Sequence, residues 1–177
     1  MAIVIRSERP EDFETIDRIH DEAFGHDWES KLIRALRTEE GYDPSLSLVA
    51  ELEGKVIGHV LFSRITVESP AGSHPALILA PLAVFKEHRS MKAGTMLVSE
   101  GIRIAKERGE TIMLVYGHRF YERFGFTMAH EKGIFRPNPM KGEFVRLLEL
   151  TEKAADGVMG VIKYPVSFKP LIEQWYN

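Results

Sequence analysis

Residues 89–95, Arg-Ser-Met-Lys-Ala-Gly-Thr, place two cations and several small residues at the predicted start of a helix. The first turn of a helix carries backbone N–H groups without intrahelical partners, and the helix dipole is positive at that end. Helix starts therefore favour acidic residues, yet no carboxylate lies between Glu87 and Glu100. Arg89 and Lys92 beside such a turn predict a cradle for an anion. On these residues alone, the alternative that both are solvated surface charges stays open.

Other motifs that carry chemistry are absent from the sequence. It contains no G-x-x-x-x-G-K-[ST] or G-x-G-x-x-G loop, no H-E-x-x-H pair and no G-x-S-x-G around a serine. It has no cysteine, which excludes disulfides, thiolate metal sites and a cysteine nucleophile. The pairs His20–Asp21 and His26–Asp27 are more typical of polar helix surfaces than of metal ligands. We therefore predict no metal site.

The composition is that of an ordinary globular protein. The 177 residues are 44% hydrophobic and carry a formal net charge of −3, which argues against a general nucleic-acid binder. No apolar run approaches the roughly 20 residues of a membrane span. The N-terminal segment turns polar after five residues and does not resemble a signal peptide. We expect a cytoplasmic protein that binds neither nucleic acid nor membrane.

The elements that must position the helix start follow from hydrophobic periodicity. Two helices are predicted early in the chain, with apolar stripes Phe13, Ile16, Ile19, Ala23 and Trp28, Leu32, Ala35, Leu36. A later helix carries the stripe Gly94, Leu97, Val98, Gly101, Ile102 and Ala105 and stops at Gly109. Strands are predicted at 2–6, 46–67 as a hairpin turning near Glu53-Gly54, 76–84, 111–116, 126–129 and 143–150. Residues 157–164 form either another strand or a packed tail, and we expect a polar loop at 69–75 and a short helical segment at 118–125. This order predicts an α/β (α+β) fold in a single domain, residues 1–177, in which residues 151–177 form a packed C-terminal extension.

A second segment, FYERFGF at residues 120–126, follows the strand after the long helix. With LEGKVIGHVLFS, LAPLAV and GVIKYP, it makes nearly the whole chain resemble a bacterial subgroup of the GCN5-related N-acetyltransferase (GNAT) superfamily. The hallmark Y-x-x-x-G-F of that family reads Tyr121, Gly125, Phe126 in this chain. The resemblance implies a mixed central β-sheet flanked by helices, and acetyl-CoA as the acyl donor.

The resemblance also assigns cofactor contacts. The family loop Q/R-x-x-G-x-G/A wraps the pyrophosphate of acetyl-CoA, and the matching residues here are Arg89, Ser90, Met91, Lys92, Ala93 and Gly94. The next residue, Thr95, is also expected to contact the cofactor. The preceding strand splays from its neighbour near a bulge in this family, which implies that Leu82, Ala83 and Val84 pair with the pantetheine arm and polarise the thioester. Pro81 fits such an edge, because proline cannot donate to a central ladder.

Lys92 departs from the family pattern, because it stands where the first loop glycine is expected. If the backbone is right-handed there, the lysine is sterically allowed and can offer its ammonium to a phosphate. If the backbone needs a positive φ, the site is damaged. Both accounts are open at the level of sequence.

Tyr121 is the catalytic residue that the resemblance implies. A phenol can protonate the thiolate that leaves when an amine attacks a thioester. The alternative is that Tyr121 belongs to an aromatic core with Phe120, Phe124 and Phe126.

The general base is poorly specified by the sequence. His59, on the predicted strand VIGHVLFS, is the candidate, although a histidine among apolar neighbours is more often a satisfied core residue. Glu22, Glu51 and His118 are weaker candidates, and a water relay would require no close carboxylate.

Together these features predict an N-acetyltransferase that moves an acetyl group from acetyl-CoA to a primary amine by direct attack in a ternary complex. The sequence does not specify whether the amine belongs to a small molecule or to a protein or peptide. It also leaves open whether the protein is a monomer or a homodimer. We expect the acceptor pocket to lie between the first two helices, residues 68–75 and the chain after residue 126, with Asp21, Glu22, Asp27 and Glu29 as acidic residues nearby. The alternatives are a non-catalytic acyl-CoA binding or sensing module, and a GNAT scaffold used only for protein association.

Overall fold

The computed structural model describes residues 2–117, 119–137 and 145–175, without the side chain of Trp175. The candidate base His118 therefore lies outside the described residues. The helices are α1 Phe13–Phe24, α2 Trp28–Leu36, α3 Ala93–Glu107 and α4 Lys169–Trp175. The strands are β1 Ile3–Ser7, β2 Ser47–Leu52, β3 Lys55–Ser69, β4 Gly72–Val84, β5 Ile112–Tyr116, β6 Thr127–Met128, β7 Ile134–Phe135, β8 Val145–Glu149 and β9 Gly160–Lys163.

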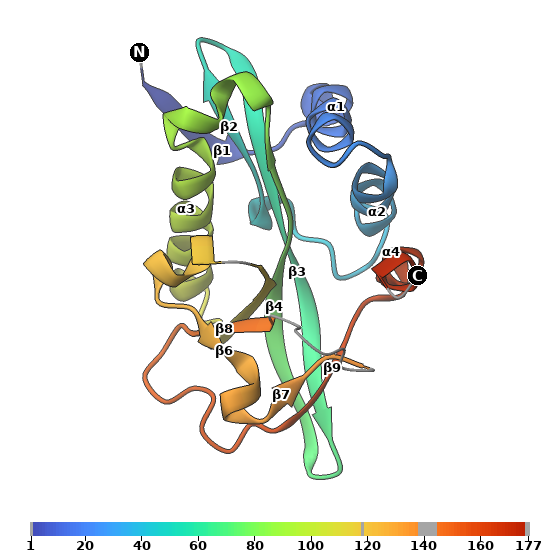
Figure 1. Ribbon diagram of the computed structural model, residues 1–177, viewed down its shortest axis with the longest axis vertical. Coiled ribbons are helices and arrows are strands. Elements are labelled where there is room, and N and C mark those ends of the chain that lie inside the picture. Colours follow the sequence, from blue (N-terminus) through green and yellow to red (C-terminus); the bar gives the residue numbers. More distant parts are fainter. Residues whose placement is uncertain (1, 118, 138–144, 176–177) are drawn as a thin grey trace.

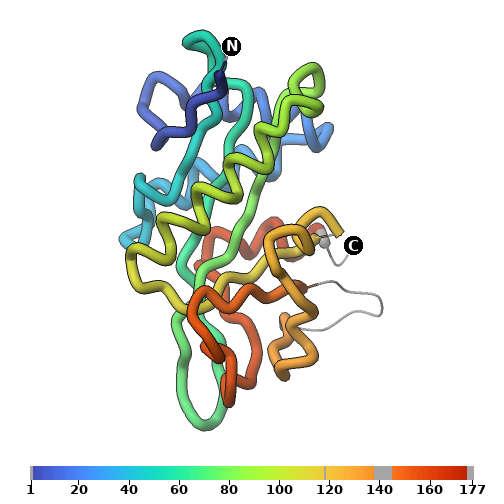
Figure 2. Tube along the Cα trace, turned by 90° about the vertical axis from the view of Figure 1, so that its left-hand side faces the viewer, coloured from blue at the N-terminus to red at the C-terminus, as the bar shows by residue number. Residues whose placement is uncertain are grey.

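One mixed sheet organises the chain, in the order β1-β2-β3-β4-β5-β8-β6, with β9 beside β3 and β7 beside β9. Its pairs are antiparallel except β4–β5 and β7–β9. Helix α3 covers one face, and α1, α2 and α4 lie on the other (Figure 1). The view turned by 90° shows α3 running diagonally across the sheet in front of the N-terminal helices (Figure 2). The predicted mixed sheet flanked by helices is confirmed.

Strands β4 and β5 separate early, and this separation opens the sheet. Their parallel pairing covers only Leu77–Leu79 against Met113–Val115. Strand β3, in contrast, stays paired with β4 as far as Gly58 opposite Val84, with a register irregularity between Val60 and Phe62. Beyond Leu79, the β5-facing edge of β4 therefore has no strand partner among the described residues.

The first hairpin turns where the sequence predicts, and both of its central residues, Glu53 and Gly54, have positive φ values of 52° and 76°. That is the combination a two-residue type I′ turn requires. The predicted polar loop at 69–75 is wrong, because β3 and β4 stay paired to the end, with Ser69 opposite Gly72. Turn-forming residue types are tolerated there near the tip of a long hairpin, which β9 joins on the β3 side at Thr66–Glu68.

Helix α2 is rotated from the face that the sequence predicts. Its buried apolar residues are Leu32, Ile33 and Leu36, whereas Trp28 is 38% exposed. The chain end supplies part of the covering layer, since Phe168 and Leu171 are buried against the α1–α2 side of the sheet. Helix α4 was not predicted from the sequence.

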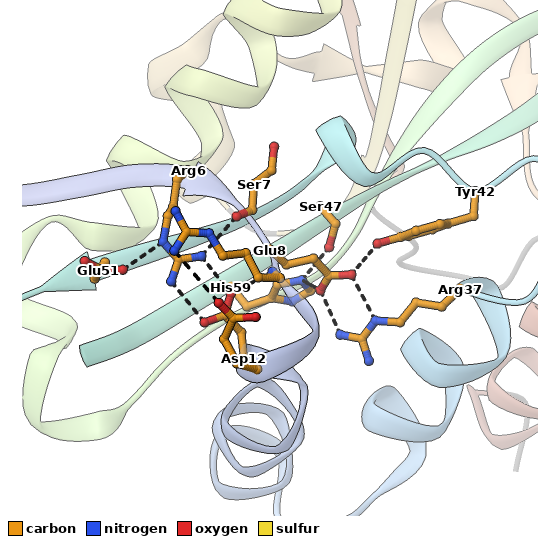
Figure 3. Close-up of polar contacts among 11 residues, drawn as sticks. Arg6, Ser7, Glu8, Asp12, Arg37, Tyr42, Ser47, Glu51 and His59 are labelled. Carbon is orange, nitrogen blue, oxygen red and sulfur yellow. Dashed lines mark hydrogen bonds and ion pairs between the residues drawn. The ribbon is translucent and has the colours of Figure 1, made fainter. Parts of the chain in front are cut away.

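A buried polar network ties β1, β2, β3 and α2 together (Figure 3). The Glu8 carboxylate accepts two hydrogen bonds from Arg37, at 2.9 and 2.7 Å, and one from the Tyr42 hydroxyl. His59 Nε2 lies 3.5 Å from Glu8 and 2.9 Å from Ser47 Oγ. Burial by itself would raise the pKa of the Glu8 carboxyl, but the contacts with His59 and Arg37 outweigh it and hold the pKa well below its ordinary value.

We predict that Glu8→Gln lowers the free energy of unfolding by about 3–5 kcal/mol, because the guanidinium of Arg37 would stay buried without its counter-charge. Urea titration at pH 7 measures this change. The depressed pKa gives the sign of the pH dependence: the contribution of Glu8 is complete above the ordinary glutamate pKa of 4.5 and is lost as pH falls below it. The difference between the two proteins should therefore shrink below about pH 5.

Glu11→Gln is the matched control, because Glu11 is exposed and forms just one long ion pair among the described residues, 3.9 Å to the exposed Arg9. It should change stability little at any pH. Equal effects of the two substitutions would contradict the network's role.

Candidate active site

Helix α3 begins with unpaired backbone donors. Its first intrahelical hydrogen bond runs from the Met96 N–H to the Lys92 carbonyl, at 3.0 Å. The N–H groups of Ala93, Gly94 and Thr95 precede that bond and have no intrahelical acceptor. The first turn holds no acidic residue and the N-cap makes no side-chain hydrogen bond. This end of α3 is electropositive and free to receive an anion.

A cavity of about 420 Å³ opens in front of this helix start. Eight of the residues predicted for the cofactor line it: Leu82, Ala83, Val84, Arg89, Ser90, Lys92, Gly94 and Thr95. Met91 and Ala93 do not, since Met91 is 39% exposed and Ala93 is fully buried against the core. The lining unites the unpaired edge of β4 with the start of α3, and an extended molecule with an anionic end would fit both.

Three cations surround that cavity: Arg89, Lys92 and Arg123. Arg89 Nε donates to the Val84 carbonyl at 3.3 Å, which holds its guanidinium beside the end of β4. Arg123 lies over the ring of Phe120, with 4.7 Å between guanidinium carbon and ring centroid. Arg123 was not predicted, although the signal was present, because it sits inside the same YERFGF segment as Tyr121.

Lys92 adopts a left-handed backbone conformation, with φ 63° and ψ 13°. A residue with a Cβ costs about 1–2 kcal/mol in that region relative to its right-handed form, whereas glycine is free of the clash. The position thus has the geometry for which a glycine is suited. Its side chain nevertheless lines the cavity and adds a positive charge there.

A second cavity, also about 420 Å³, lies on the other side of Leu82 and Phe120. Phe24, Leu82 and Phe120 line both cavities, so the two adjoin. The second is lined further by Glu29, Leu79, Ala80, Pro81, Tyr116, Gly117, Tyr121 and Leu171. It therefore occupies the space where β4 and β5 have separated, with α1, α2 and α4 closing it.

Tyr121 lies in this second cavity, on the short 3₁₀ helix Arg119–Phe124. Its ring makes edge contacts with Phe120 and Phe126, with centroids 5.1 and 5.8 Å away. The ring also lies directly over Gly117, where a Cβ would come within 2.3 Å of it. Burial raises the pKa of Tyr121 to about 12, so the phenol keeps its proton at neutral pH.

The structure does not bring His59 to Tyr121. His59 is fully buried, and its Nδ1 lies 2.9 Å from His20 Nε2, while its other nitrogen faces Ser47 and Glu8. Burial lowers its pKa. It lines neither cavity, and it has the partners of a satisfied core histidine. The weaker candidates are also engaged elsewhere: Glu51 binds Arg6, and Glu22 accepts from the Lys86 N–H.

Of the acidic residues expected near the acceptor pocket, only Glu29 is among those described as lining the second cavity. Asp21 accepts a hydrogen bond from Ser30 at 2.6 Å, and Asp27 pairs with Lys31. Residues 68–75 and the chain after residue 126, expected as walls, do not line it as far as the described lining shows, apart from Leu171 of α4. The hairpin pairing of β3 and β4 carries residues 68–75 elsewhere.

Among the described residues, no three acidic or histidine side chains gather closely enough to hold a metal ion. None of the helices in the described ranges has the length and apolar content needed to cross a membrane.

The chain is similar to known acetyltransferases. Residues 13–126 match the acetyltransferase (GNAT) family. The uncharacterized N-acetyltransferase YjhQ of Escherichia coli K12 is 38% identical over 134 residues, 75% of this chain and 74% of YjhQ. The uncharacterized N-acetyltransferase YhbS of the same strain is 33% identical over 168 residues, 94% of this chain and 98% of YhbS.

Two solved structures share the fold over most of their length. The crystal structure of E. coli YhbS in complex with CoA superposes with a TM-score of 0.85 at 32% identity, covering 94% of this chain and 92% of YhbS. A GNAT family acetyltransferase from Brucella melitensis in complex with acetyl-CoA gives 0.76 at 25% identity, covering 94% of this chain and 98% of that one. With a family match over residues 13–126, which include every described lining residue of both cavities except Leu171, and with relatives of nearly equal length, this chain belongs to the acetyltransferase (GNAT) family.

Proposed function

We propose that this protein transfers an acetyl group from acetyl-CoA to a primary amine by direct attack in a ternary complex. The observation that carries the proposal is the adjoining pair of cavities on the two sides of Leu82. One offers cations and free backbone N–H groups to a pyrophosphate, and the other offers a buried phenol to the reaction. The CoA and acetyl-CoA bound by the two solved relatives support the choice of donor.

In this proposal, the pantetheine arm pairs with the unpartnered edge of β4 at Leu82–Val84. That edge directs the thioester from the cationic cavity toward Tyr121. A backbone N–H of the edge polarises the thioester carbonyl, and the Tyr121 phenol protonates the departing thiolate. The expected cytoplasmic location stays a prediction.

A non-catalytic acyl-CoA sensor is the second candidate, and the left-handed backbone of Lys92 favours it. A side chain at a glycine-suited position is what a loop no longer selected for close phosphate approach would contain. Release of free CoA from acetyl-CoA in the presence of an amine panel separates the two functions.

Arg89→Ala should weaken acetyl-CoA binding by about 1–3 kcal/mol, the scale of a lost charge-assisted hydrogen bond. Titration calorimetry measures this, and urea unfolding should change little. Arg103→Ala is the matched control, because Arg103 also belongs to the α3 region but is 53% exposed and pairs with Glu100 and Glu107. Unaltered acetyl-CoA affinity in the Arg89 variant would show that Arg89 does not contribute to cofactor binding.

Lys92→Gly should raise the free energy of unfolding by about 0.5–1 kcal/mol, because glycine adopts the left-handed region without a Cβ clash. Urea titration checks this. Lys55→Gly, at the exposed start of β3, should not stabilise the protein. A less stable Lys92 variant would show that the lysine side chain makes contacts worth more than its backbone strain.

The same Lys92 variant distinguishes two accounts of the cofactor loop. If the ammonium binds a phosphate, acetyl-CoA affinity should not improve and should depend less steeply on salt concentration. Tighter binding by the glycine variant would show instead that Lys92 obstructs the loop, which supports the sensor.

Tyr121→Phe should lower kcat about 10²–10⁴-fold, the range for loss of a general acid. Acetyl-CoA affinity should survive, because the ring that packs on Gly117 is kept. Tyr42→Phe, which removes a buried hydroxyl outside both cavities, should leave kcat near that of the parent protein. If the Tyr121 variant keeps the parent kcat under conditions where chemistry limits the rate, Tyr121 is a packing residue of the aromatic core and not the general acid.

A further inference from the structure

Glu29 stands in the first turn of α2 and faces the cavity that contains Tyr121. It is the one carboxyl among the described residues lining that cavity. Its side chain is only 9% exposed. An acidic group this deeply buried is uncommon unless it is paired.

The Glu29 carboxyl is only partly satisfied by the described residues, because a backbone hydrogen bond reaches it but one of its oxygens accepts none. Its Oε2 atom is buried and has no hydrogen-bond partner among them. The nearest basic group is His26, whose Nδ1 lies 3.1 Å from Oε2 and is itself without a hydrogen bond in the described part of the chain. Burial raises the pKa of Glu29. A buried carboxylate in this condition is stabilised by a cationic donor that enters the cavity.

The rest of the cavity wall is apolar or aromatic. The apolar residues that line the cavity with Glu29 include Phe24, Leu79, Pro81, Leu82 and Leu171, and two tyrosines line it as well. A molecule with one ammonium and an apolar body would pair its charge with Glu29 and bury the remainder against these side chains. A second cation on the same molecule would meet no described carboxylate in the cavity, and burying an unpaired charge is costly.

We propose that Glu29 binds the ammonium of the acceptor and accepts its proton, and that the acceptor is accordingly a primary monoamine on an apolar body. This inference rests on the proposed acetyl transfer and names the substrate class of the same site. Glu29 would then be a catalytic residue, because it touches the nucleophile.

Glu29 and Tyr121 together account for every proton that moves in the reaction. An N–H bond of the ammonium breaks, its electron pair stays on nitrogen, and Glu29 takes the proton. The amine then forms a C–N bond to the thioester carbon, and the C–S bond breaks with its pair moving to sulfur. Tyr121 gives its proton to that sulfur and regains one from the new amide nitrogen. One proton remains on Glu29.

His26 provides the exit for that proton. Its Nδ1 faces Glu29, and its side chain is 34% exposed, so the ring reaches from Glu29 to solvent. The ring stacks on Trp28, with centroids 4.1 Å apart, and also lies beside Phe24. These contacts hold the imidazole in place. Trp28, which is 38% exposed because α2 turns it away from the core, thus positions His26 against Glu29.

The first test uses the unaltered protein and two probes of matched length, n-pentylamine and 1,5-diaminopentane. Both present a primary ammonium, and only the second carries a cation at its far end. We expect kcat/KM, measured by CoA release at saturating acetyl-CoA, to be at least about 10-fold higher for pentylamine. Equal values, or a preference for the diamine, would overturn the substrate class.

The second test replaces Glu29 by Gln, which keeps the shape and removes the charge. With pentylamine at pH 7.5, kcat/KM should fall on the order of 10²-fold or more. Acetyl-CoA affinity should stay unchanged, which shows that the variant is folded. Glu29→Asp, which keeps a carboxyl, should recover part of the loss. Asp27→Asn removes a neighbouring exposed charge and should have little effect.

The pH profile separates a base from a structural residue. Near pH 7.5, only about a thousandth of an alkylamine is unprotonated. The deficit of Glu29→Gln should therefore shrink as pH rises toward 10, because free amine no longer needs a base. The titratable groups that interact with Glu29 are His26 and Asp21, while Tyr116 and Tyr121 line the same cavity, and all four are kept in the variant. A deficit that is constant with pH would contradict proton removal by Glu29.

The outcomes distinguish this inference from the proposed function. If pentylamine is acetylated equally by the parent protein and by Glu29→Gln, Glu29 has no such role while the acetyl transfer stands. If the parent protein binds acetyl-CoA but transfers to neither probe, nor to 2-phenylethylamine or a lysine peptide, the proposed function fails as well.

Discussion

The separation of β4 from β5 after Leu79 is the constraint on which the rest of the site depends. A parallel pair that continued to Val84 would fill the space of both cavities and would consume the backbone edge of β4. Strand β3 makes the separation possible, because it keeps β4 in the sheet from the other side. The open edge is thus held rigidly on one side only, which suits it to pair with an extended ligand.

The elements that border the open edge of β4 determine the charge of each cavity. The start of α3 supplies free N–H groups, and Arg89, Lys92 and Arg123 add cations, so one end favours an anion. The other end is closed by apolar faces of the N- and C-terminal helices around a single described carboxyl, Glu29. The two ends of the groove therefore differ in charge, as the proposed anionic donor and cationic acceptor require.

The sequence predicted those elements and site residues that local patterns encode. The 3.6-residue period of α3 and the apolar run of β4 predicted the unit that borders the cationic cavity, and the loop pattern pointed to Arg89 and Gly94. The left-handed turn at Lys92 was left open, because one residue's φ depends on how strand and helix are joined. The burial of Glu29 and exposure of Trp28 depend on a rotation of α2 that only tertiary packing decides. His59 was ambiguous for the same reason, since its partners come from distant segments.

In the proposed function, the β4 edge and the start of α3 together hold acetyl-CoA. Hydrogen exchange followed by mass spectrometry, with and without saturating acetyl-CoA, tests it at the backbone groups concerned. The account predicts slowed exchange in peptides that contain Leu82–Val84 and Ala93–Thr95, and no change in the β3–β4 hairpin around residues 69–73. Acetyl-CoA binding that leaves both of those segments unprotected would contradict it.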